Sequence, residues 1–194
     1  MPEKNIDSQI RKNGFIKGLL LGFIILMLSI CSYYFIIDIA KEPWEDLLGP
    51  YIFSMIIPLL LIVFFALDIR KKLGGWWSFK QAVTGTFIMI FTSYVILTIG
   101  RDFIFAKAIE PNMIQKLETA MLNSSTSMYK KQGLSQAQIN SQIAERKQGF
   151  EGQKTVSTGV IIQNFIINTI LLFVLAIILG ALLNRESRQP VINE

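Results

Sequence analysis

Residues 156–183 read VSTGVIIQNFIINTILLFVLAIILGALL, a stretch without a single charged residue. A helix needs about 20 mainly apolar residues to cross the roughly 30 Å hydrocarbon core of a bilayer. Only a helix satisfies every backbone hydrogen bond within one such segment. The stretch therefore predicts a membrane-spanning α-helix.

Three further apolar runs of similar character precede this stretch, at about residues 14–39, 50–67 and 79–104. The chain has 194 residues, of which 52% are hydrophobic and 17% charged, and a soluble domain carries more charge than this. We predict an all-α integral membrane protein with four transmembrane helices, arranged as a single membrane domain over residues 1–194.

The only sizeable polar segment lies between the third and fourth runs, at about residues 105–155. Glu110-Pro111 is expected to interrupt the helix. Apolar residues then recur at helical spacing until Gly133 interrupts the pattern. Ser135 and Gln138 match a capping box, as do Ser78 and Gln81 before the third run. We predict a helical hairpin, which could lie on the membrane surface, on its own spans or against a partner. Its apolar stripe is a candidate partner surface and consists of Ile114, Leu117, Met121 and Met128.

Lys and Arg gather before the first run, between the second and third, and after the fourth, whereas the first connection is mainly acidic. The positive-inside rule then places both termini in the cytoplasm and the hairpin on the extracytoplasmic side. Trp76-Trp77 suits an aromatic anchor at headgroup level. Basic residues beside apolar runs contact lipid headgroups, so membrane lipids are expected partners. No basic stretch is interleaved with aromatic residues, so we expect no nucleic acid.

Small residues recur every four positions on two of the predicted spans. They create a flat surface where another helix backbone can approach closely, either in an oligomer or within the chain. The sequence leaves these two alternatives open. The helix-packing residues are Gly14, Gly18 and Gly22 in the first span and Ala176 and Gly180 in the fourth.

The composition argues against catalysis. The chain has no histidine and one cysteine, which excludes Ser-His and Cys-His pairs, histidine-ligated metals and an intrachain disulfide. Asp38, Asp68 and Asp102 all fall at span edges, where Arg101 can pair with Asp38 or Asp102. We expect no enzyme, and no catalytic, cofactor or metal site. Gln163, Asn164 and Asn168 give the fourth span polar groups that can hydrogen-bond to other helices.

Several short motifs occur in a recognisable order. They are Gly14-x3-Gly18, the turn Lys72-Leu73-Gly74-Gly75 leading to Ser78-Phe79-Lys80-Gln81-Ala82, Gly85, a Pro-initiated helix after the third span, and Gly133-Leu134-Ser135-Gln136-Ala137-Gln138-Ile139. In these the chain resembles a bacterial family of small four-helix membrane proteins classed as a domain of unknown function. The resemblance implies a bacterial inner-membrane location and no particular activity.

Two functions fit these features. The first is a non-catalytic accessory subunit, scaffold or regulator of a larger envelope complex, whose partner is another membrane or envelope protein or a second copy of the chain. The alternative is a small transporter or lipid-handling protein that acts as an oligomer. Buried ionisable groups and discontinuous helices would favour this alternative.

Overall fold

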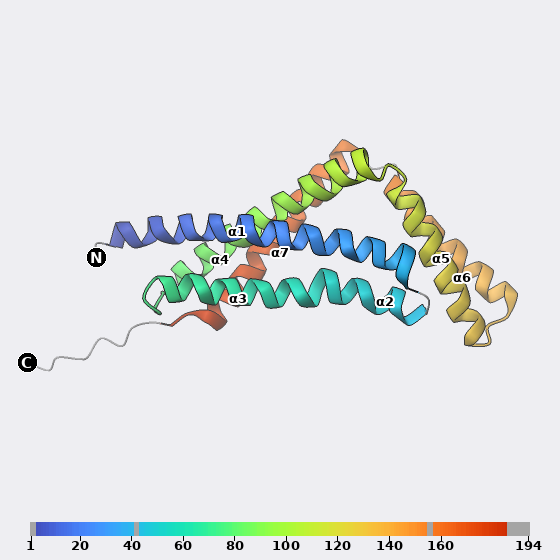
Figure 1. The fold of residues 1–194 in the computed structure, drawn as a ribbon, viewed down its shortest axis with the longest axis horizontal. Coiled ribbons are helices and arrows are strands. Elements are labelled where there is room, and N and C mark those ends of the chain that lie inside the picture. Colours follow the sequence, from blue (N-terminus) through green and yellow to red (C-terminus); the bar gives the residue numbers. More distant parts are fainter. Residues whose placement is uncertain (1–2, 41–42, 155–156, 186–194) are drawn as a thin grey trace, which may run out of the picture. The chain divides into compact units, whose positions relative to one another are not determined.

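The computed structural model describes residues 3–40, 43–154 and 157–185 (Figure 1). Within these ranges every regular element is a helix, and the one strand-like pairing is a bridge between Trp77 and Arg185. The all-α prediction is confirmed. The elements are α1 (Glu3–Tyr34), η1 (Phe35–Ile39), α2 (Pro43–Tyr51), η2 (Ile52–Ile56), α3 (Ile57–Lys72), α4 (Phe79–Leu97), η3 (Thr98–Ile109), α5 (Met113–Lys131), α6 (Gln136–Lys154) and α7 (Thr158–Leu183), where η marks π-helical geometry.

Among the described residues, four helical stretches are long and apolar enough to cross a membrane, as a multi-pass membrane protein requires, and each overlaps one of the four predicted runs. The third runs past the predicted residue 104, because the chain meets its first breaker at Glu110-Pro111. The predicted hairpin end at Thr155 and span start at Val156 lie outside the described residues. The four stretches are Ile6–Ile39, Leu48–Lys72, Phe79–Ile109 and Thr158–Leu183.

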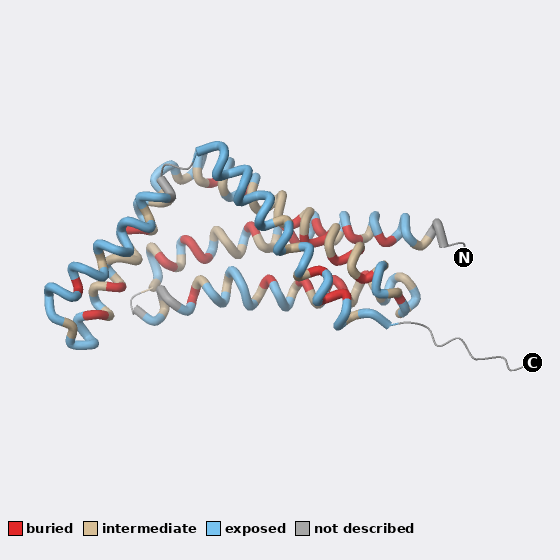
Figure 2. The backbone as a smooth tube through the Cα atoms, turned by 180° about the vertical axis from the view of Figure 1, so that it is seen from behind, coloured by how far each residue is buried: buried red, intermediate tan, exposed pale blue. Residues whose placement is uncertain are grey.

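The chain divides into two compact units, and each is described by itself. The first unit comprises Met1–Ile24, Leu59–Leu97 and Ile166–Glu194. Its described part contains segments of α1, α3, α4 and α7. Buried positions recur along α1 every three or four residues, so one face of this helix packs inward (Figure 2). The buried positions of this segment are Ile10, Gly14, Gly18, Leu21 and Gly22.

The turn between α3 and α4 belongs to the first unit and follows its sequence signals. Gly74 and Gly75 adopt φ values of 94° and 86°, which side chains disfavour. The predicted capping box is confirmed, because the backbone N–H of Ser78 donates to Gln81 Oε1 at 3.0 Å. Trp77 differs from the expected headgroup anchor. It is 2% exposed and donates Nε1–H to the Leu183 carbonyl at 2.8 Å, and only its neighbour Trp76 is exposed.

The second unit comprises Ile25–Pro58 and Thr98–Phe165. Helix α5 packs against α6, η1 and α2, and α5 and α6 run side by side as the predicted hairpin (Figure 1). Gly133 makes the hairpin turn with φ at 76°. The second capping box is confirmed by a 3.0 Å bond from the Ser135 N–H to Gln138 Oε1. Pro111 does not open α5, which begins at Met113 after an N-cap at Asn112.

Candidate functional site

The three glycines of the first span face α4 inside the first unit. A Cβ added at Gly14 would lie 2.9 Å from the Gly85 carbonyl oxygen, and one at Gly18 would lie 2.7 Å from that of Met89. A Cβ added at Gly22 would lie 2.9 Å from the Cβ of Ile96. Each distance is shorter than a real side chain tolerates, so the two backbones are in direct contact. This contact surface on α1 is therefore occupied within the chain.

Helix α7 meets the same helix through its own small residues. Ala176 is fully buried, and a Cβ at Gly180 would lie 2.5 Å from Val83 Cγ2 and 3.1 Å from the Val83 nitrogen. Phe173 packs edge-on against Phe87 of α4. Within the first unit, α4 thus receives the small residues of both α1 and α7. Small-residue contacts of this kind let membrane helices gain dispersion energy at close range.

A cation and an anion from different helices pair beside these contacts. Lys17 Nζ lies 2.6 Å from Asp68 Oδ2, and Lys72 Nζ approaches the same oxygen at 3.5 Å. Lys17 Nζ also lies 5.1 Å from the ring centre of Phe65. Sequence reasoning treated Lys17 only as a topology signal and missed this pair. The signal was present, because antiparallel spans one and two place the start of one beside the end of the other.

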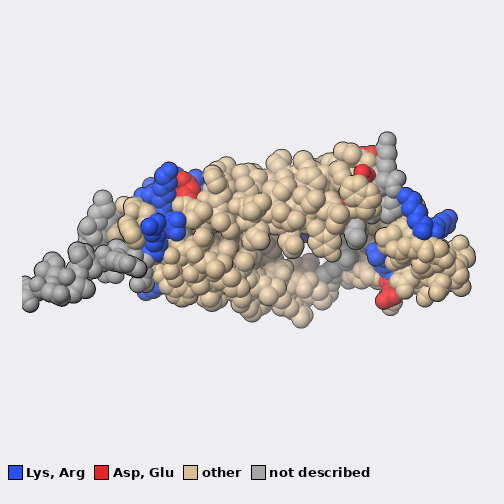
Figure 3. Space-filling view, turned by 90° about the horizontal axis from the view of Figure 1, so that it is seen from below, with Lys and Arg blue, Asp and Glu red and all other residues tan. Residues whose placement is uncertain are grey.

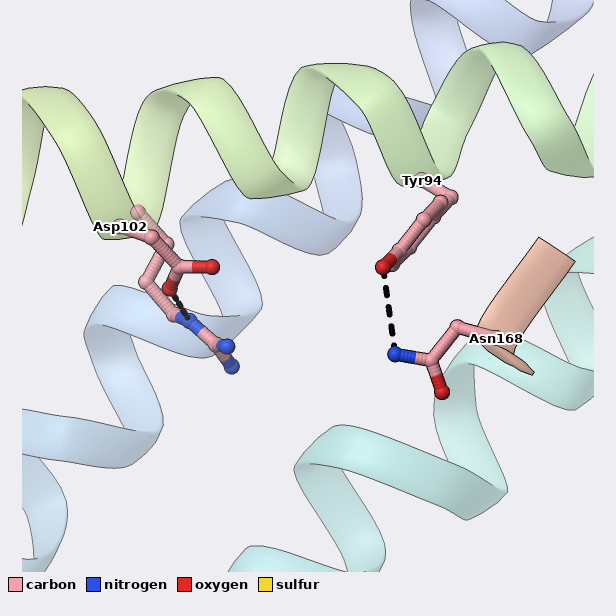
Figure 4. A network of polar contacts seen from close by, with 4 residues as sticks. Tyr94, Asp102 and Asn168 are labelled. Atoms are coloured by element: carbon pink, nitrogen blue, oxygen red, sulfur yellow. Dashed lines mark hydrogen bonds and ion pairs between the residues drawn. The ribbon is translucent and has the colours of Figure 1, made fainter. Parts of the chain in front are cut away.

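The polar residues of α7 do not gather into one cluster. Asn168 donates from Nδ2 to the Tyr94 hydroxyl at 3.2 Å (Figure 4). Gln163, Asn164 and Asn168 are all exposed. Separately, in the second unit, Arg101 Nε donates to Asp102 Oδ1 at 2.7 Å, which is one of the two predicted pairings. Each of these contacts joins two polar side chains.

The apolar stripe of α5 is less open than the sequence suggests. Helix α5 instead buries more polar residues, and among them Tyr129 accepts a hydrogen bond from Arg146 Nε of α6 at 3.1 Å. Neither hairpin helix presents a broad apolar face. The four stripe residues, all half-buried, are Ile114, Leu117, Met121 and Met128.

A groove of about 610 Å³ opens between η1 and α5 at the base of the hairpin. Six of its eight lining side chains are polar, and two of those carry charge. Asp38 is exposed and makes no hydrogen bond or ion pair with another described residue. The groove is lined by Ile37, Asp38, Asn112, Gln115, Lys116, Thr119, Ala120 and Asn123.

Contacts among three polar side chains hold one wall of the groove in place. Lys116 Nζ lies 2.7 Å from Glu110 Oε2, and the Tyr33 hydroxyl donates to the same oxygen at 3.3 Å. The hydrogen bond from Lys116 holds the pKa of Glu110 below its usual value, and the same bond raises the pKa of Lys116. Tyr33 packs edge-on against Phe105 at 5.5 Å. Side chains from α1, η3 and α5 are therefore joined by direct contacts at the hairpin base.

The comparisons with known proteins give one match. A family model described as Protein of unknown function (DUF4199) matches residues 16–185. The chain belongs to this family. The predicted family resemblance is confirmed, and the matched residues include the whole groove. No curated protein and no solved structure matches the chain.

Sequence reasoning missed the groove of this DUF4199 member. At 100° per residue, the α5 residues that line it fall on the side of the helix opposite the apolar stripe. Their polar repeat was visible, since Asn112, Gln115, Lys116, Thr119 and Asn123 follow helical spacing. The contribution of Asp38 was not visible, because it comes from a different helix. Among the described residues, no three His, Cys, Asp or Glu side chains gather as metal ligands would.

Proposed function

We propose that this chain is a non-catalytic bacterial inner-membrane protein that acts as an accessory subunit or scaffold of a larger envelope complex. Both termini lie in the cytoplasm, and the α5–α6 hairpin lies outside. The groove at the hairpin base carries the proposal. In our account this groove, rather than the apolar stripe, receives a polar segment of another envelope protein.

The chemistry of the groove favours a protein segment over a small ligand. Small-molecule pockets are mostly apolar and bury most of their ligand. This groove is open, and its lining includes Asn112, Gln115 and Asn123. Their amides both donate and accept, so they can pair with the N–H and C=O groups of an incoming backbone. The exposed Asp38 carboxylate favours a Lys or Arg on that segment, because opposite charges steer association and fix register.

The base of the hairpin is built to hold its shape. Tyr33 is 6% exposed and packs edge-on against the rings of Phe105 and Tyr34, while its hydroxyl reaches Glu110. A groove whose walls are fixed before binding loses less side-chain freedom when a partner enters. This rigidity supports docking.

The distribution of charge supports the proposed orientation. Lys and Arg side chains gather at the end of the first unit where α1 begins and α3 ends (Figure 3). The last turn of α3 alone contributes Arg70, Lys71 and Lys72. Such clusters lie on the cytoplasmic side by the positive-inside rule.

The alternative, a transporter or lipid-handling oligomer, receives less support. An oligomer could use the glycine surface of the first span, for which the sequence left association and packing within the chain as open alternatives. That surface contacts α4 within the chain at Gly14 and Gly18. It is therefore not free to join a second copy.

Site-specific photocrosslinking in native membranes tests the docking proposal. A photoreactive residue at Thr119 or Asn123 should give one discrete crosslinked protein product. Asp38→Lys should reduce that product at least tenfold, because it replaces attraction by repulsion at the groove. Glu145→Lys, an equal change of charge on an exposed position of α6, is the matched control and should leave the product unchanged. Crosslinks only to lipid, or equal loss in both variants, would contradict the proposal.

A further inference from the structure

A second cavity lies in the first unit, between the beginning of α1 and the first turns of α4. Its volume is about 60 Å³, and Ile10, which is 1% exposed, is among its lining residues. Two of the other lining side chains are cationic, two are neutral and polar, and one is acidic. The lining residues are Asp7, Ile10, Arg11, Lys80, Gln81 and Thr84.

The polar groups of this cavity are mainly hydrogen-bond donors. Arg11, Lys80 and Thr84 make no hydrogen bond or ion pair with another described residue. Gln81 accepts the Ser78 N–H through Oε1, which leaves its amide NH₂ group available. Two cations against the single carboxylate of Asp7 give the cavity a net positive charge. An oxyanion matches this set, because guanidinium and ammonium groups bind oxyanions through charge-assisted hydrogen bonds.

The size of the cavity narrows the choice of anion. Its volume of about 60 Å³ equals roughly two water molecules at about 30 Å³ each. That space suits one tetrahedral oxyanion and is too small for a whole nucleotide or sugar phosphate. The rest of any larger ligand must lie outside the cavity.

The position of the cavity indicates where such a ligand comes from. The first apolar stretch begins at Ile6, and α4 begins at Phe79, so the cavity lies at one end of two spans. This is the level at which lipid phosphates lie when those helices cross a bilayer. Other Lys and Arg side chains surround this end of the unit (Figure 3). Basic pockets between spans at this level are suited to anionic headgroups.

We propose that this cavity binds the phosphate group of an anionic phospholipid. Arg11 and Lys80 neutralise the phosphate, and Gln81 and Thr84 donate to its remaining oxygens. The acyl chains lie along the apolar surfaces of the neighbouring helices. The bound lipid joins α1 to α4 at the membrane edge. This inference does not depend on the docking groove.

Lipid binding to the purified chain in mild detergent tests the proposal. Native mass spectrometry and thermal unfolding would be measured with phosphatidylglycerol, phosphatidylcholine or inorganic phosphate. The wild type should retain one phosphatidylglycerol and unfold at a higher temperature with it. Phosphatidylcholine should have a much smaller effect. Equal stabilisation by inorganic phosphate at the same concentration would overturn the assignment to a lipid.

A matched pair of double variants separates the cavity from general surface charge. Arg11→Gln with Lys80→Gln should weaken phosphatidylglycerol binding about tenfold or more, which corresponds to loss of charge-assisted contacts. Lys12→Gln with Lys71→Gln removes the same charge from exposed positions outside the cavity and should have little effect. Equal weakening in both pairs would overturn the proposal.

A milder variant keeps the test valid if the first pair folds poorly. Thr84→Val removes one donor and leaves both cations in place. It should lower phosphatidylglycerol binding several-fold while the helical circular dichroism spectrum stays unchanged. Unchanged binding in a folded Thr84→Val protein would contradict the predicted role of its hydroxyl.

Discussion

The two units use different means to bring helices together. In the first unit, α1 meets α4 through Gly14 and Gly18, so the contact is between backbones. In the second unit, the ring and hydroxyl of Tyr33 reach Phe105 and Glu110, so the contact is made by long side chains. All three π-helical segments also belong to the second unit.

This difference determines which substitutions each unit tolerates. A backbone contact leaves no room for a larger residue, so the first unit should be sensitive to added atoms. A side-chain contact fails when the side chain is removed, so the second unit should be sensitive to truncation.

Truncation of Tyr33 should have the largest effect. Tyr33→Ala removes a buried ring that packs on Phe105 and Tyr34, and comparable aromatic truncations cost about 3–5 kcal/mol. Tyr33→Phe keeps the ring and loses only the bond to Glu110, at a cost of about 1 kcal/mol. Thermal or denaturant unfolding in detergent measures both. Similar losses in the two variants would mean that the hydroxyl, and not the ring, holds the hairpin base.

Replacing a glycine by alanine should lower stability more in the first unit than in the second. Gly18→Ala places a Cβ against the Met89 backbone and should cost about 1–3 kcal/mol. The three atoms nearest to a Cβ at Gly100 all belong to the Leu26 side chain, which shifts more readily than a backbone, so the cost of Gly100→Ala should be below about 1 kcal/mol. The two melting curves provide the comparison. A larger loss at Gly100 would remove the proposed difference between the units.

A substitution at Thr86 in the first unit should not lower stability, in contrast to Gly18→Ala. Its hydroxyl is buried and has no hydrogen-bond partner among the described residues. Thr86→Val replaces that hydroxyl by a methyl group of similar shape and should leave stability unchanged or raise it by about 1 kcal/mol. Thr92→Val on the same helix is a control. If Thr86→Val lowers the melting temperature by several degrees, the hydroxyl has a partner that the described contacts omit.

The Glu110–Lys116 pair at the hairpin base should make stability depend on pH, and the effect should be small. Glu110 has its pKa lowered by Lys116, so its contribution is present above the usual pKa of 4.5 and is lost as pH falls through the lower folded value. Lys116 has its pKa raised, so its contribution is present below 10.5 and is lost as pH rises through the higher folded value.

Melting temperature followed against pH tests this prediction. The contribution of this pair should be constant between pH 4.5 and 10.5, and its loss should add to the decline in melting temperature on either side. Glu110→Gln should reduce the decline at the acid side and at the alkaline side together, because it removes the common partner. If the acid and alkaline declines in melting temperature are unchanged in Glu110→Gln, other groups cause the whole pH dependence.

Much of the fold could be predicted because its determinants are local. The charge-free run at residues 156–183, the two capping boxes and the Gly133 turn each act within a few residues. The continuation of the third helix to Ile109 likewise follows from the absence of an earlier breaker. Gly149 and Gly152 suggest a helix end, yet α6 continues through both to Lys154.

The site was harder to predict because its residues come from distant parts of the chain. Asp38 and Asn123 line one groove although they belong to η1 and α5. Periodicity indicates which residues share one helix face, but not which face meets another helix. The same limit explains why the pairing of Lys17 with Asp68 was missed.

Cysteine labelling in intact cells tests whether the hairpin lies on the extracytoplasmic side of the membrane. In a Cys31→Ser background, Gln132→Cys marks the hairpin turn and Lys71→Cys marks the last turn of α3, and both positions are exposed. A membrane-impermeant maleimide should label Gln132→Cys in intact cells and Lys71→Cys only after the membrane is permeabilised. Labelling of Lys71→Cys in intact cells, with Gln132→Cys protected, would contradict the orientation and the docking function that depends on it.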